Sequence, residues 1–182
     1  MGTAIVLIAF GVLARLVPHP SNAVPLGALA LYAGAKLPRR WALAVPLGAL
    51  LLSDLALGDG SVRPFLHPTK LAIYVTYILI ALAGRLRPGA ASPAVRCGMA
   101  AGASVLFFVT TNFAVWATDD GTMYPPTSAG LAACYLAGIP FFRNNLMAEL
   151  IGTGLLFGLF DPIACWIAAR WAKRPALAAN ID

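Results

Sequence analysis

The stretch GMAAGASVLFFVTTNFAVWA, residues 98–117, decides the fold class of this chain. It carries no charged side chain and is long enough to cross a bilayer, since a helical crossing takes about 20 residues. The rest of the chain has the same character: of its 182 residues, 60% are hydrophobic and 11% are charged. The mean hydropathy is +0.80. A soluble domain averages about 45–50% apolar and about 25% charged residues. We therefore expect an all-α integral membrane protein.

Composition and missing motifs exclude several other classes of protein. So apolar a chain is neither disordered nor a nucleic-acid-binding domain, despite its net charge of +6. Its 3 cysteines, an odd number, all lie within or beside apolar runs, which argues against a disulfide scaffold. Phosphate-binding loops, catalytic triads and paired catalytic carboxylates are missing, and the 2 histidines lie far apart. We therefore predict no enzyme activity, no bound cofactor and no metal site.

Working outward from residues 98–117, further apolar runs fill most of the chain. The segment 130–142 is shorter than a crossing and ends in Pro140 and Arg143, so we expect it to be a re-entrant or broken helix. The other runs predict about six transmembrane helices, in a single domain at residues 1–175 with a short tail at 176–182. These runs are Thr3–Val17, Val24–Leu37, Trp41–Leu57, Leu71–Leu86, Gly98–Ala117 and Leu146–Trp171.

The distribution of basic residues indicates a topology. Nine of the 13 Lys and Arg residues fall in three clusters at or beyond the ends of apolar runs, and cytoplasmic loops of membrane proteins collect Lys and Arg. Placing these clusters inside predicts a multi-pass protein of the bacterial inner membrane with both termini cytoplasmic. The clusters are Lys36, Arg39 and Arg40; Arg85, Arg87 and Arg96; and Arg170, Lys173 and Arg174.

This topology gathers the unusual polar residues on the outer side. Ionisable groups at membrane depth are costly to insert, so they usually face a partner or a wet cavity. Two interpretations stay open: pairs such as Arg15–Asp54 and Arg143–Glu149 hold the bundle together, or the same groups line a pocket for a ligand. The candidate binding residues are Arg15, His19, Asn22 and Asp54 on one wall, and Asn112, Trp116, Tyr124, Arg143, Asn144 and Glu149 on the other.

Small residues recur along several helices and allow close helix packing. In the run at 24–37 they include Gly27, Ala30, Ala33 and Gly34. Internal packing is one interpretation of this pattern. A smooth face on the first or second segment, on which another membrane subunit docks, is the alternative.

In four motifs the chain resembles a family of uncharacterised bacterial membrane proteins. They are RLVPHPSN at 15–22, TNFAVW at 111–116, YPPT at 124–127 and PFFRNNL at 140–146. In size and helix count that family is in turn similar to the substrate-binding S components of energy-coupling factor (ECF) vitamin transporters. This resemblance implies a six-helix bundle with a ligand pocket near the outer face. It also implies partners, namely a transmembrane coupling subunit and ATPases.

We therefore expect a substrate-binding membrane subunit for uptake of a vitamin-like or metal-containing small molecule. In this role the charged and amide groups orient the ligand and the aromatic side chains stack on it. The alternative is a structural or accessory subunit of a larger membrane complex, in which the polar residues only join helices to one another.

Overall fold

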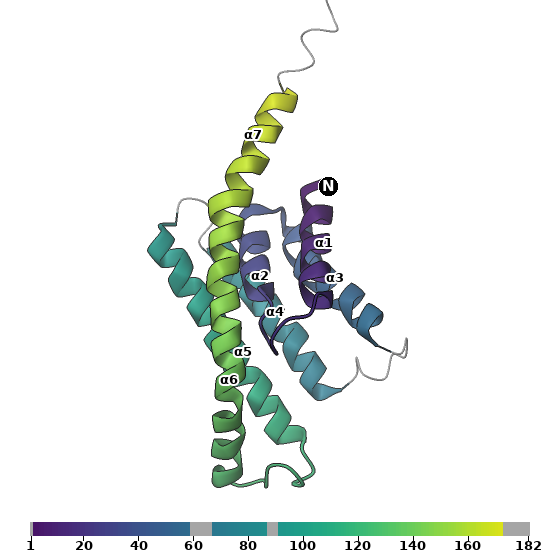
Figure 1. The fold of residues 1–182 in the computed structure, drawn as a ribbon, viewed down its shortest axis with the longest axis vertical. Coiled ribbons are helices and arrows are strands. Elements are labelled where there is room, and N and C mark those ends of the chain that lie inside the picture. Colours follow the sequence, from purple (N-terminus) through teal and green to yellow (C-terminus); the bar gives the residue numbers. More distant parts are fainter. Residues whose placement is uncertain (1, 59–66, 87–90, 173–182) are drawn as a thin grey trace, which may run out of the picture.

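The computed structural model describes residues 2–58, 67–86 and 91–172, and the regular structure in these ranges is helical throughout. The prediction of an all-α chain is confirmed for this part of the molecule. The elements, shown in Figure 1, are α1 (Gly2–Leu16), α2 (Leu26–Lys36), α3 (Arg39–Leu57), α4 (Pro68–Leu86), α5 (Pro93–Thr118), α6 (Ser128–Thr153), η2 (Gly154–Phe160) and α7 (Asp161–Ala172). Arg87, Lys173, Arg174 and the predicted tail at 176–182 lie outside the described residues.

Four of the described helices are long and apolar enough to cross a membrane. They are α3, α4, α5 and one continuous helix at Ser128–Trp171, which combines α6, η2 and most of α7. Many of their large apolar side chains are exposed, for example Val75, Leu79 and Leu82 on α4. Exposed apolar surface of this extent suits contact with lipid. The chain is therefore compatible with a multi-pass helical membrane protein.

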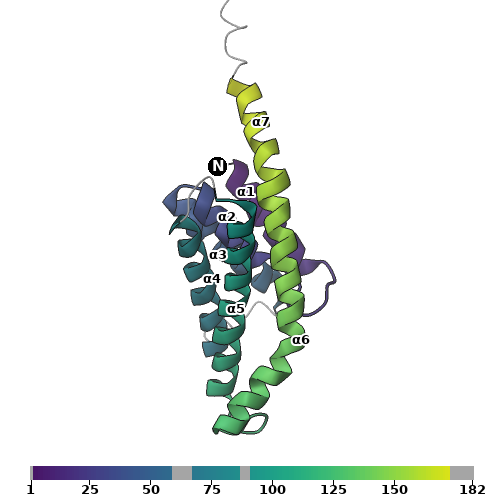
Figure 2. The ribbon, with the colours of Figure 1, turned by 90° about the vertical axis from the view of Figure 1, so that its left-hand side faces the viewer.

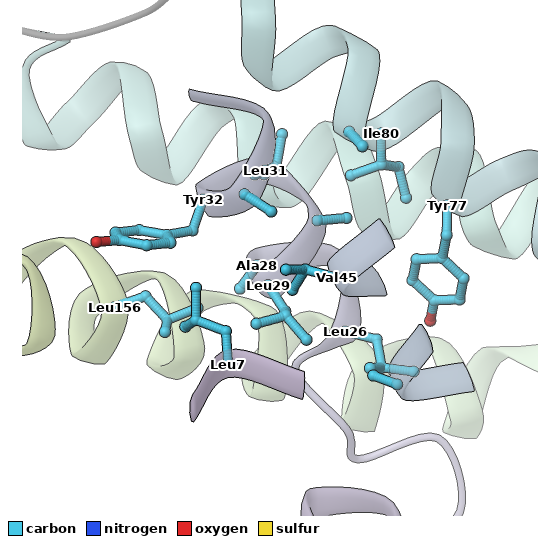
Figure 3. Packing of buried hydrophobic residues seen from close by; sticks show 14 of the residues in the cluster. Leu7, Leu26, Ala28, Leu29, Leu31, Tyr32, Val45, Tyr77, Ile80 and Leu156 are labelled. Atoms are coloured by element: carbon cyan, nitrogen blue, oxygen red, sulfur yellow. The ribbon is translucent and has the colours of Figure 1, made fainter. Parts of the chain in front are cut away.

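The core of the bundle forms around α2. Every residue from Leu26 to Gly34 is buried, because α2 packs against α3, α4, α5, α6 and η2. Figure 3 shows its apolar side chains meeting Leu7 of α1, Val45 of α3 and Ile80 of α4. The small residues of this segment are thus used inside the bundle. This corrects the alternative in which α2 offers a docking face to another subunit.

Glycines bring α2 and α4 into backbone contact. A Cβ on Gly34 would collide with the carbonyl oxygen of Ala81, and a Cβ on Gly84 would collide with the carbonyl oxygen of Leu31. Each glycine therefore admits the backbone of the opposite helix, as small residues do in membrane helix pairs.

The segment 130–142 is not a separate re-entrant helix, which corrects that prediction. It forms the first half of α6, and the helix continues through Pro140 and Arg143 without a break. Proline removes one backbone N–H and kinks a helix, yet the remaining hydrogen bonds hold α6 together. In Figure 2 the first part of α6 is inclined to the rest.

The short helices α1 and α2 leave space at one end of the molecule. With 15 and 11 residues, they rise about 1.5 Å per residue and are shorter than a hydrocarbon core of about 30 Å. Figure 1 shows the hairpin of α5 and α6 extending well beyond the segment that joins α1 to α2. The candidate site lies in this space.

Candidate functional site

A cavity opens between the α1–α2 segment and helices α4, α5 and α6. It has two lobes, of about 290 Å³ and about 210 Å³. Asn22, Ile73, Phe107 and Asn145 line both lobes, so the lobes adjoin. We call the larger one the aromatic lobe and the smaller one the charged lobe.

The aromatic lobe lies between the C-terminal half of α5 and the middle of α6. Four phenylalanines line it, namely Phe107, Phe108, Phe141 and Phe142. Its polar lining comprises Asn22, Thr69, Thr111, Asn112, Tyr124, Cys134 and Asn145. Apolar walls with a few placed polar groups are the usual lining of a small-molecule site.

Asn112 is held in this lobe from two sides. Its Nδ2 donates to the carbonyl oxygen of Phe108 over 2.8 Å, one turn earlier in α5. Gly138 of α6 faces its Oδ1, and a Cβ at position 138 would lie 2.5 Å from that atom. The glycine therefore leaves room for the amide at the helix interface.

A three-residue ionic cluster of Arg15, Asp54 and Lys70 adjoins the charged lobe. Arg15 Nη2 lies 2.5 Å and Lys70 Nζ lies 3.0 Å from the same carboxylate oxygen, Oδ1 of Asp54. The hydroxyl of Tyr74 donates to Asp54 Oδ2 over 3.3 Å. Arg15 and Lys70 line the lobe, whereas the buried Asp54 does not. The Arg15–Asp54 pair thus joins α1 to α3 and also places a cation in the cavity wall.

Asn145 of α6 stands where the two lobes meet. Its residue is 4% exposed, and its Oδ1 has no hydrogen-bond partner among the described residues. A buried polar atom without a partner costs about 1–3 kcal/mol. Because Asn145 lines both lobes, a bound molecule whose donor reaches this oxygen would supply the missing hydrogen bond.

Glu149, one turn after Asn145, faces α2 instead of the cavity. Its carboxylate accepts hydrogen bonds from the backbone N–H groups of Gly27, over 2.7 Å, and of Ala28. These N–H groups belong to the first turn of α2, which begins after Pro25 and has no side-chain cap of its own. A carboxylate at a helix N-terminus also offsets the positive end of the helix dipole. Glu149 therefore caps α2 from a neighbouring helix.

The α1–α2 segment is held against the cavity by its backbone conformation and by a hydrogen bond from α6. Asn22 adopts a φ of 62°, a left-handed conformation that Asn tolerates better than most residues. The side chain of Asn144 donates to the carbonyl oxygen of Ser21 over 3.1 Å, which ties the segment to α6. His19 lines the charged lobe, with its Nδ1 2.8 Å from the carbonyl oxygen of Pro20.

The turn between α5 and α6 positions Tyr124 in the aromatic lobe. Asp119 Oδ2 accepts from the backbone N–H groups of Gly121, Met123 and Tyr124, over 3.1, 3.1 and 2.8 Å. In the same turn, hydrogen bonds from the side chain and backbone of Thr122 lower the pKa of Asp120. Trp116 closes the turn by donating from Nε1 to the carbonyl oxygen of Pro125 over 3.1 Å.

The structure thus brings together five of the residues predicted from sequence and places the others around them. Lining the cavity are Arg15, His19, Asn22, Asn112 and Tyr124. Asp54, Trp116, Asn144 and Glu149 support its walls through the bonds described above. Arg143 is exposed on α6 and makes no ion pair with Glu149 among the described residues.

Sequence reasoning missed Asn145 and Lys70. A usable signal for Asn145 existed, because the buried positions of α6 include 134, 138, 145, 149 and 152, a helical spacing that places them on one face. The expected break at Pro140 hid this periodicity. Lys70 gave no comparable signal, since its carboxylate partner is on another helix.

A sequence model of a family of unknown function, DUF6580, matches residues 1–171 of the chain. The chain belongs to this family. The match covers every helix described above except the last residue of α7, so the cavity lies wholly within the family's domain. No curated protein and no solved structure matches the chain.

Proposed function

We propose that this member of DUF6580 is a substrate-binding membrane subunit that captures a small, vitamin-like molecule in the cavity for uptake. Asn145 is the observation that carries the proposal. Asn145 lines both the charged lobe and the aromatic lobe, and its buried Oδ1 is unpartnered within the described structure.

The position of the cavity supports a role in capture from outside the cell. It lies at the end of the bundle opposite to the basic residues Lys36, Arg85 and Arg96, whose contacts lie just before α3, in η2 and at the start of α7. Cytoplasmic loops of membrane proteins are rich in such residues. On this orientation the cavity opens away from the cytoplasm.

The transport step requires partners under this proposal. The described chain has no nucleotide-binding motif, and S components of ECF transporters work with a transmembrane coupling subunit and ATPases. We extend the same kind of partnership to this protein. One candidate contact surface is the outer face of η2, where a Cβ added at Gly154 or Gly158 would meet nothing within 4 Å.

The test is to identify small molecules that the purified protein releases on denaturation, by mass spectrometry. We expect the wild type to release a defined molecule and Asn145→Leu to release at least tenfold less, because the substitution removes the polar atom at the centre of the site.

Thr153→Val is the matched control for this experiment. Thr153 lies on the same helix, is buried and has an unpartnered Oγ1 within the described structure, but it lines neither lobe. It should retain the molecule at the wild-type level. Equal loss in both variants, or no released molecule from the wild type, would contradict the proposal. Stable association with a non-transport complex would then favour the accessory-subunit alternative.

A further inference from the structure

The charges around the cavity indicate which class of molecule binds there. This inference rests on the proposed function. Among the described residues that line the two lobes, none is acidic. Arg15, His19 and Lys70, by contrast, line the charged lobe. The described wall of the cavity is therefore basic.

Asp54 offsets only part of this positive charge. Arg15 and Lys70 bind the same oxygen of its single carboxylate, over 2.5 and 3.0 Å. Two cations facing one anion leave a surplus of one positive charge in this cluster. Both side chains keep contact with open space, at 18% and 33% exposure, so the surplus is available to a molecule in the lobe.

The other described carboxylates near the cavity are engaged elsewhere. Glu149 accepts the N–H groups of α2, and Asp119 accepts three N–H groups of the α5–α6 turn. Neither lines a lobe. A charge at membrane depth is costly unless it is paired, so an anionic group on the ligand would complete the cluster.

The adjoining lobe selects the remainder of the molecule. Its walls include four phenylalanine rings, which suit a flat apolar body. Asn145 lines both lobes, and its Oδ1, which is an acceptor only, has no donor among the described residues.

We propose that the ligand is an amphipathic organic anion carrying one negative charge. Its anionic group meets Arg15 and Lys70, its flat apolar body lies between α5 and α6, and an N–H or O–H group between them donates to Asn145 Oδ1.

The first arm of the test is the identity of the molecule released from the wild-type protein. It should be an anion at neutral pH that combines one acidic group with an apolar ring. If the released molecule is neutral or cationic, the ligand class is wrong while the proposed binding function stands.

The second arm measures binding of three matched probes by calorimetry in detergent: indole-3-acetate, indole-3-acetamide and tryptamine. They share an indole ring with an N–H donor and differ in charge. We expect the acetate to bind about tenfold or more tightly than the acetamide, because hydrogen bonds to charged groups are the stronger ones. Tryptamine should bind most weakly.

Lys70→Met should abolish the preference for the acetate, since Arg15 and Asp54 then neutralise each other. Lys36→Met removes a cation from an ion pair with Asp161 at the opposite end of the bundle and should leave the preference intact. Equal binding of the acetate and the acetamide to the wild type, or an unchanged preference in Lys70→Met, would overturn the ligand class alone. Failure to bind any probe, together with no released molecule, would overturn the proposed function as well.

Discussion

At the scale of single residues, the role of Glu149 shows how a buried acid can serve the fold of a site without entering it. The carboxylate holds the first turn of α2, which follows the segment that carries His19 and Asn22 into the cavity wall. We predict that Glu149→Gln lowers the stability of the ligand-free protein by about 2 kcal/mol, because the amide replaces an acceptor with a donor facing an N–H group. Thermal unfolding in detergent should show a drop of about 5 °C.

Arg143→Gln is the control for this substitution. Arg143 is exposed on the same helix and forms no ion pair with Glu149 among the described residues. Its unfolding midpoint should stay within about 1 °C of the wild type, as expected for surface changes. An unchanged midpoint in Glu149→Gln would show that α2 does not depend on this cap.

Residue patterns allowed part of the site to be predicted. Arg15 and Asn112 were found because polar groups inside apolar runs are rare and costly. The target of Glu149 was out of reach, since backbone N–H groups carry no residue-specific pattern. Whether Asp54 faces Arg15, Lys70 or a ligand also depends on how the helices pack. The spacing of residues along one sequence does not determine this packing.

At the scale of helices, α6 explains why the re-entrant prediction was wrong. Pro140 and Arg143 together suggested a helix end, but each is tolerated inside a long membrane helix for its own reason. Proline costs one hydrogen bond and a bend. Arginine on an exposed face can extend its charged end toward the interface. The length of an apolar run therefore predicts the length of a helix less well where a proline lies within the run.

The contact between α2 and α4 gives a prediction at the same scale. Gly84→Ala should destabilise the protein by about 1–3 kcal/mol or more, because the added methyl group would meet the backbone carbonyl of Leu31, which cannot move as a side chain can. Thermal unfolding of the purified variant measures the effect.

Gly102→Ala in the middle of α5 provides the comparison. A Cβ there meets nothing within 4 Å, and alanine is the better helix former by about 0.5–1 kcal/mol. Its midpoint should equal or exceed that of the wild type. Equal effects at positions 84 and 102 would refute the backbone contact between α2 and α4.

At the scale of the whole molecule, the described contacts divide the bundle into two ends. Lys36 meets Asp161, Arg85 meets the carbonyl oxygen of Leu37, and Arg96 stacks on Phe157, so these three basic residues share one end. At the other end Asn144 meets Ser21, and Thr69 meets Thr118. In Figure 1 the N-terminus and α7 both lie toward the basic end. The distribution of Lys and Arg along the sequence predicted that the three basic clusters lie at one end. That prediction depends only on the order in which the helices cross, and the bend at Pro140 does not change this order.

This arrangement predicts which end faces outward. In a variant whose three native cysteines, Cys97, Cys134 and Cys165, are replaced, Thr122→Cys in the α5–α6 turn should react with a membrane-impermeant thiol reagent on intact cells. Ala94→Cys in the first turn of α5 should react only after the membrane is permeabilised. Both positions are exposed, and both changes leave the number of basic residues intact, so neither alters the charge distribution that sets the orientation. The reverse labelling pattern would place the cavity on the cytoplasmic side, where a protein for capture from outside the cell cannot have its binding site.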